Sequence, residues 1–223
     1  MERHLDEELE KLNTKLLRMA TLTETAIVNS LEALRNQDEE LSAAVIKKDH
    51  EINDMENEIE EQAIEILALF QPMAGDLRFI TTGMRINSEL ERIADLASNV
   101  AYRAQEIAGE NLLDPITDII ALSGVARTML KETIDAFVKR DKDLAAKVIT
   151  SDIESNHLRN KIMGDLIHNH MEKNTAVAAQ AVSLLLATRD LERICDHATN
   201  IAEDVIYMVD AKVVKHHPER LES

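Results

Sequence analysis

Two copies of a short acidic string are the residues of this 223-residue chain best suited to chemistry. Residues 90–95 read Leu-Glu-Arg-Ile-Ala-Asp, and residues 191–196 read Leu-Glu-Arg-Ile-Cys-Asp. Each copy has carboxylates at i and i+4 and an asparagine at i+8, which form one ridge on a helix. Carboxylate and amide oxygens suit hard divalent cations, so each ridge is a candidate metal site. The candidate ligands are Glu91, Asp95 and Asn99 in the first copy and Glu192, Asp196 and Asn200 in the second.

Two carboxylates do not complete a metal site, so further oxygens must come from a neighbouring helix. Asp49 and Asp152 are the candidates, because they are matched acids in the preceding helix of each half. Such a donor set suits Mg²⁺ or Mn²⁺ and can also serve iron or zinc. A solvated acidic helix face is the alternative interpretation, but the repetition of the whole string favours a shared role.

Long helices are expected to position these residues. Apolar side chains recur every three or four positions, and Gly (5) and Pro (3) are scarce. The pattern predicts six helices, over about residues 5–35, 39–70, 76–108, 115–139, 143–172 and 176–209. The chain is also internally repeated, since residues 38–53 match residues 141–156 and the two acidic strings match each other.

These observations predict an all-α protein of two tandem, sequence-related three-helix bundles packed side by side. The first repeat is expected over residues 1–110, and the second over residues 111–223 with a short C-terminal tail. The core stripes of the third and sixth helices are predicted to be Leu90, Ile93, Ala97, Val100, Ala104 and Ile107, and Leu191, Ile194, Ala198, Ile201, Val205 and Met208. At 100° per residue the acidic ridges lie opposite these stripes, so we expect them to face away from their own bundle.

The bulk composition excludes several classes of function. The formal net charge is −17, from 42 acidic and 25 basic residues, and nucleic-acid phosphates repel such a protein. The most apolar run, residues 177–187, is about half as long as a membrane span requires. The N-terminal stretch does not read as a signal peptide. A soluble cytoplasmic protein without a nucleic-acid partner is expected.

No catalytic residue is predicted. Cys195 is the only cysteine and has no evident partnered base, so it is expected to be a small core residue. Glu154 and His157 have the Glu-x-x-His spacing of di-metal bundles, but such enzymes use two of these pairs. A surface pair is therefore the favoured interpretation. A metal-dependent carboxylate-bundle enzyme and a purely structural bundle are the alternatives to a regulatory protein.

The doubled acidic string resembles the paired signature of the PhoU family. The resemblance rests on residues 91–99 and 192–203, and it extends to the Asp-Leu-Arg string at 76–78 and to residues 49–53. It covers nearly the whole chain, from about residue 5 to residue 208. The family's usual glycine before the second acid is replaced here by Ala94 and Cys195.

The resemblance implies a function and partners. Members are cytoplasmic accessory proteins of the phosphate-specific transport system, usually homodimers, and they dampen the phosphate-starvation response. They are thought to link the phosphate ABC transporter, through its ATPase subunit, to a sensor histidine kinase, so they meet the membrane only through partners. Some hold metal ions or iron clusters on the repeated motif, which corresponds here to Glu91, Asp95, Glu192 and Asp196, with Asn99 and Asn200 beside them.

Overall fold

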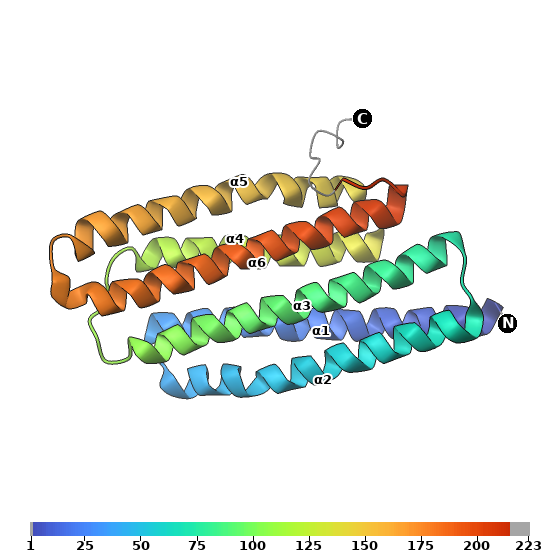
Figure 1. The fold of residues 1–223 in the computed structure, drawn as a ribbon, viewed down its shortest axis with the longest axis horizontal. Coiled ribbons are helices and arrows are strands. Elements are labelled where there is room, and N and C mark those ends of the chain that lie inside the picture. Colours follow the sequence, from blue (N-terminus) through green and yellow to red (C-terminus); the bar gives the residue numbers. More distant parts are fainter. Residues whose placement is uncertain (1, 215–223) are drawn as a thin grey trace.

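The computed structural model describes residues 2–214, with side chains from residue 4 onward, and this part of the chain is helical without any strand. Its α-helices are α1 (Glu2–Asn36), α2 (Glu39–Phe70), α3 (Ala74–Glu106), α4 (Ile116–Lys139), α5 (Lys142–Asp165) and α6 (Ala178–Asp210) (Figure 1). Two short helical segments, η1 (Leu166–Met171) and η2 (Thr175–Val177), join α5 to α6. The predicted fold class is confirmed. The predicted C-terminal tail, residues 215–223, lies outside the described residues.

The helix boundaries lie within three residues of the prediction, except at the end of the fifth helix. The third helix begins at Ala74, so Asp76 lies in its first turn and does not cap it. The fifth α-helix was expected to continue to about residue 172, but the chain changes to a π-helical segment at Leu166. Apolar periodicity does not distinguish α from π winding over a single turn, so this change was not foreseeable from the pattern.

Matched caps begin the second helix of each repeat. The Asp38 carboxylate accepts a hydrogen bond from the Leu41 amide at 2.9 Å. At the equivalent position, Asp141 accepts from the amides of Asp143 and Leu144, both at 3.0 Å. Each aspartate satisfies amide groups that the first helical turn leaves without partners. The sequence repeat therefore extends to the N-terminal capping of α2 and α5.

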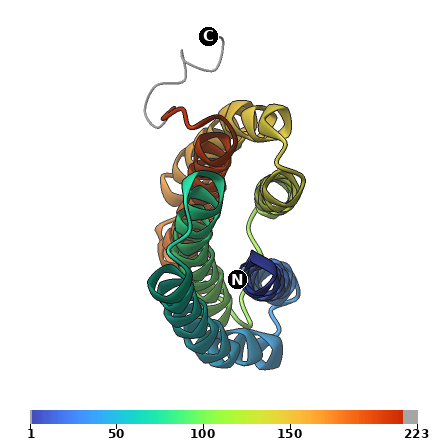
Figure 2. The same ribbon diagram turned by 90° about the vertical axis from the view of Figure 1, so that its right-hand side faces the viewer.

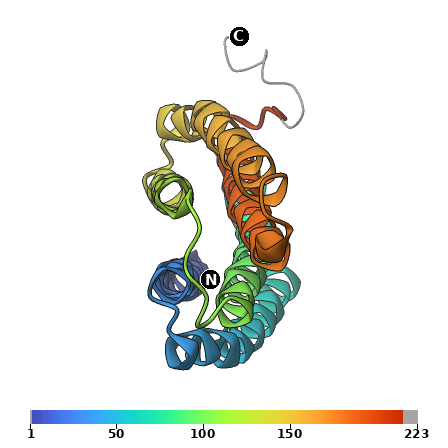
Figure 3. The same ribbon diagram turned by 90° about the vertical axis from the view of Figure 1, so that its left-hand side faces the viewer.

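The helices form two layers, as the end-on views show (Figures 2 and 3). One curved layer contains α2, α3, α6 and α5 in that order, and α1 and α4 lie side by side on its inner face. The third helices of the two repeats, α3 and α6, pack against each other at the centre. Each of them therefore has helical neighbours on three sides.

A single hydrophobic core joins both repeats. Buried side chains of all six helices belong to one cluster, which is continuous across the α3–α6 contact. All twelve residues of the two predicted core stripes are buried, so that prediction is confirmed. The division of the chain at residue 110 stays a prediction, because the two groups of helices share this core. No helix between residues 2 and 214 is long and apolar enough to cross a membrane.

Candidate functional site

The first acidic ridge lies along the seam between α2 and α3. On α3, Glu91 is half-buried, and Asp95 and Asn99 are exposed. Asp49 of α2 reaches this seam, because its carboxylate accepts hydrogen bonds from Ser98 of α3 at 3.3 Å and from Asn53 at 3.2 Å. The structure therefore brings the predicted acid of the second helix to the predicted acids of the third.

Four carboxylates repel one another along this seam. Burial raises the pKa of Glu91, and the nearby charges of Asp95, Glu56 and Asp49 raise it further. Asp95 is exposed, but partial desolvation of its carboxyl group and the charge of Asp49 likewise raise its pKa. The pKa of Glu56 is also raised, first by burial and then by the charge of Glu60, with a smaller contribution from Asp95. A bound cation would relieve this repulsion, because opposite charge favours the ionised form of each group.

The donor atoms of the first ridge are oxygens, the type that hard cations prefer. Besides the carboxylates, Oδ1 of Asn53 is buried and accepts no hydrogen bond, so one amide oxygen in the seam has no partner. Sequence reasoning missed Glu56, although it lies seven residues after Asp49 and therefore on the same face of α2. Asp49, Glu56, Glu91 and Asp95 are hereafter called the first acidic cluster.

The second ridge lies in the equivalent seam between α5 and α6, but it contains a cation of the protein itself. Nη1 of Arg159 lies 3.0 Å from Oε1 of Glu192. Nη2 of the same arginine donates to Oδ1 of Asn156 at 2.9 Å, and Asn156 donates to Asp152 at 2.8 Å. Burial raises the pKa of Asp196, and the charge of Asp152 adds to this effect. The predicted acids again meet, with a guanidinium among them.

The second ridge is less exposed than the helical wheel predicted for a ridge that faces away from its own bundle. Glu192 is only 8% exposed, because α6 is surrounded by α3, α4 and α5. The amide of Asn200 donates to Glu89 of the first repeat at 3.3 Å, so it contacts the other bundle. A helical wheel places a residue relative to the core of one bundle. It does not show how many other helices pack around the helix that carries the residue. The expectation of two outward ridges is therefore corrected for Glu192, which is buried and pairs with Arg159 of its own repeat.

A buried polar network joins the repeats at Glu89. Its carboxylate, 8% exposed, lies 2.5 Å from Nδ1 of His197 and also contacts Asn200 and Arg92. Burial opposes ionisation of Glu89, but the hydrogen bonds from His197 and Asn200 outweigh it and lower the pKa. The correspondence of His197 to Leu96 in the other repeat favours a solvent-facing or interface position for this histidine, but nothing in the local sequence marks Glu89 as its partner.

Three further side chains agree with their predicted roles or positions. Cys195 is fully buried, and burial raises the pKa of its thiol to about 12, as expected of a core residue. Glu154 and His157 are both exposed, so this pair lies on the surface.

In the part of the chain that the structure describes, no three His, Cys, Asp or Glu side chains stand close enough to hold a metal ion as they are. A cation at either ridge would therefore require carboxylates to rotate toward it.

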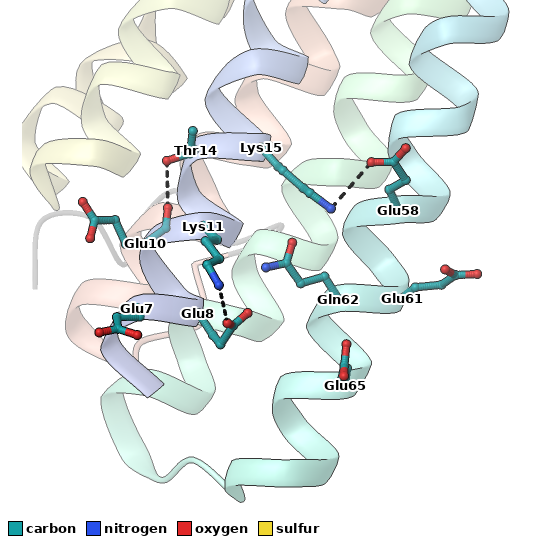
Figure 4. Close-up of a pocket in the computed structure, with 10 residues that line it drawn as sticks. All are labelled: Glu7, Glu8, Glu10, Lys11, Thr14, Lys15, Glu58, Glu61, Gln62 and Glu65. Atoms are coloured by element: carbon teal, nitrogen blue, oxygen red, sulfur yellow. Dashed lines mark hydrogen bonds and ion pairs between the residues drawn. The ribbon is translucent and has the colours of Figure 1, made fainter. Parts of the chain in front are cut away.

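A separate acidic groove of about 880 Å³ lies between the start of α1 and the end of α2 (Figure 4). Lys11 pairs with Glu8 at 2.7 Å, and Lys15 lies 3.6 Å from Glu58. Both pairs are partly exposed to solvent, and surface ion pairs contribute little to stability. The groove shares no residue with either ridge, so it is distinct from the repeated motif.

The fold and the doubled motif define a class of protein: two tandem three-helix bundles that share one core, each with an acidic seam on its third helix. Comparison with known proteins gives this class a family. The sequence model of the PhoU domain matches residues 16–104 and again residues 119–205. This chain belongs to the PhoU family.

Relatives match over nearly their full lengths. A phosphate-specific transport system accessory protein PhoU homolog of Clostridium acetobutylicum is 36% identical over 94% of this chain and 95% of its own. The homolog of Aquifex aeolicus is 38% identical over 95% of this chain and 96% of its own. The crystal structure of PhoU from Pseudomonas aeruginosa has a TM-score of 0.89 at 35% identity and covers 93% of this chain and 99% of its own. The crystal structure of the phosphate transport system regulatory protein PhoU from Streptococcus pneumoniae has a TM-score of 0.88 at 25% identity. This match covers 94% of this chain and 99% of that protein's chain.

Proposed function

We propose that this protein is an accessory protein of a phosphate-specific transport system and regulates phosphate uptake. The observation that carries the proposal is the match of both halves to the PhoU domain. Relatives named as phosphate-specific transport system accessory proteins also align over more than nine-tenths of the chain. The buried, high-pKa thiol of Cys195 and the exposed Glu154 and His157 favour a protein that acts by binding rather than by catalysis.

In the finer form of this proposal, the protein is a cytoplasmic negative regulator of the phosphate-starvation response. It acts as an adaptor between the ATPase subunit of a phosphate ABC transporter and a phosphate-sensing histidine kinase. Its net charge of −17 can steer it toward basic faces of partner proteins. It contacts the membrane only through these partners.

Deletion of the gene with the transporter intact tests the regulatory role. We expect phosphate-responsive transcription to stay switched on in phosphate-rich medium, and the full-length protein supplied in trans to restore repression. Normal repression in the deletion strain would contradict the proposal. A pull-down of the full-length protein against the transporter ATPase and the kinase tests the adaptor role separately, and failure to retain either partner in high phosphate would argue against it.

We further propose that the protein forms a homodimer, as the family resemblance implies. Exposed apolar side chains at the turn between α2 and α3, namely Leu69 and Met73, are 67% and 80% exposed and offer apolar area for association. Light scattering after size-exclusion chromatography distinguishes a mass of twice 25.1 kDa from the mass of the single chain. A single-chain mass at micromolar protein concentration would contradict the homodimer.

The acidic ridges are proposed to bind a divalent metal ion. The mutual repulsion of Asp49, Glu91 and Asp95 and the unpartnered oxygen of Asn53 support this proposal for the first ridge. Mg²⁺ and Mn²⁺ fit the oxygen donors best, and iron or zinc would need further ligands. When bound, the metal would supply positive charge to the seam between α2 and α3, and the side chains of this seam would orient around it.

A further inference from the structure

We propose that the groove between the start of α1 and the end of α2 is the docking site for a basic amphipathic helix of a partner protein. The inference rests on the proposed adaptor function, because it names the surface through which this protein would meet a partner. It does not depend on the proposed metal binding, since the groove shares no residue with either ridge.

The size of the groove matches a short stretch of helix. It has a volume of about 880 Å³, and all of its lining residues belong to α1 and α2 (Figure 4). The lining extends from Glu7 to Lys15 on α1 and from Glu58 to Glu65 on α2. At a rise of 1.5 Å per residue, each wall is roughly 12 Å long, which is about two helical turns. A partner helix laid in this groove would contact both walls along that length.

The charge of the groove is negative and only partly balanced. Six glutamates and two lysines line it. Both lysines already pair with glutamates of the walls, at 2.7 and 3.6 Å. Among the described residues, no cation pairs with Glu10, Glu61 or Glu65. Lys and Arg side chains of an incoming helix would therefore meet carboxylates that no cation of this protein occupies.

An exposed leucine continues the α2 wall beyond its acids. Glu58, Glu65 and Leu69 follow one another at steps of seven and four residues, so they lie on one face of the helix. Leu69 is 67% exposed. An acidic wall that ends in an apolar side chain fits an amphipathic helix, whose contact residues recur at i, i+4 and i+7. The groove therefore favours a partner helix with a basic face and an apolar residue at the end near Leu69.

The bundle architecture does not account for the glutamates of this wall. At the matched positions of α5, the three glutamates of the α2 wall are replaced by Lys161, Gly164 and His168. Lys161 instead pairs with Asp118 of α4 at 2.8 Å. Both repeats form the same kind of three-helix unit, so the acids are a property of the first repeat and not a requirement of the fold.

A synthetic peptide tests the groove in the full-length protein. The probe is a fluorescein-labelled, alanine-based helix of about five turns with lysines along one face and a leucine at each end of that face. A control peptide of the same composition has its lysines distributed around the helix. By fluorescence polarisation, we expect the control to bind about tenfold more weakly than the probe, and binding of the probe to weaken as salt is added. Equal binding of both peptides would reflect net charge alone and would overturn the proposal.

A matched pair of variants locates the binding surface. Glu61→Gln/Glu65→Gln removes two charges of the groove without breaking an ion pair, and Glu32→Gln/Glu154→Gln removes two exposed charges elsewhere. We expect the groove variant to bind the probe about fivefold more weakly and the control variant to change binding less than about twofold. Circular dichroism verifies that both stay helical. Equal losses would overturn the proposal, and so would probe binding that disappears when light scattering shows a dimer, because a second copy would then occupy the groove.

The pull-down separates failure of this inference from failure of the proposed function. We expect the groove variant to lose retention of the transporter ATPase or of the kinase, and the control variant to keep both. If the groove variant retains both partners as well as the unsubstituted protein does, the groove is not the docking site and the adaptor function stands. If the unsubstituted protein retains neither partner, the adaptor function fails and the inference fails with it.

Discussion

The imidazole Nδ1 of His197 lies 2.5 Å from Oε2 of Glu89, across the boundary between the two repeats. Both side chains are about 90% buried, so this contact lies inside the α3–α6 interface. It is asymmetric, because the matched positions in the opposite repeats are Asp190 and Leu96. The pair therefore belongs to the way the two bundles dock and not to the architecture of either bundle alone.

Replacing Glu89 by Gln should destabilise the protein by about 1–3 kcal/mol at pH 7. The substitution removes a buried charge that accepts bonds from His197 and Asn200, and unsatisfied buried partners carry costs of this size. Urea denaturation followed by circular dichroism measures the change. Arg92→Gln is the control, since it removes only a half-exposed pair with the same glutamate and should cost less than about 1 kcal/mol. Equal effects of the two substitutions would contradict the assigned role of the network.

The contribution of Glu89 should depend on pH in a defined direction. Its pKa is lower in the folded protein than its ordinary value of 4.5, so its stabilising effect is present above about pH 4.5 and is lost as the pH falls through the folded pKa. The difference in unfolding free energy between the unsubstituted protein and Glu89→Gln should therefore shrink between pH 7 and pH 3. A difference that grows in acid would contradict the lowered pKa.

Asp95→Asn should slightly stabilise the protein at pH 7 in the presence of a chelator. The pKa of Asp95 is raised, so its ionised form is disfavoured in the folded state, and neutralising it should gain a few tenths of a kcal/mol. Thermal unfolding in EDTA measures the gain. Glu154→Gln is the matched control, because the side chain of Glu154 is exposed on α5, and this substitution should leave the melting temperature unchanged. A loss of stability in Asp95→Asn would mean that the carboxylate is satisfied without metal.

Leu90→Ala and Leu191→Ala should each cost about 2–5 kcal/mol. Both leucines are fully buried at equivalent positions of α3 and α6, within one core cluster. Since the repeats share that core, each substitution should shift a single unfolding transition in differential scanning calorimetry. Two separable transitions, with each substitution moving only one, would show that the repeats unfold independently.

The thiol of Cys195 should react with Ellman's reagent only after unfolding. It is fully buried, and its pKa of about 12 leaves almost no thiolate at pH 8. We expect reaction in the native protein to be slower by orders of magnitude than in 6 M guanidinium chloride. Rapid reaction without denaturant would show that α6 opens locally or that the thiol is more acidic than its surroundings imply.

The sequence by itself determined the helices, the repeat and the core stripes. These features depend on local periodicity, on caps such as Asp38 and Asp141, and on apolar residues that recur on one helical face. Such interactions join residues within a few turns of each other, so a linear pattern contains them. The meeting of Asp49 with the acids of the following helix could also be predicted, because the repeat marks matched acids in adjacent antiparallel helices.

Only the tertiary structure decided which charges face each other. Glu89 and His197 are 108 residues apart, and their contact depends on how α3 docks on α6. The charge that the second helix of each repeat adds to its seam depends on one matched side chain, Glu56 in the first repeat and Arg159 in the second. Electrostatic energy depends on distances of a few ångströms between atoms, and these distances are set only when the helices pack.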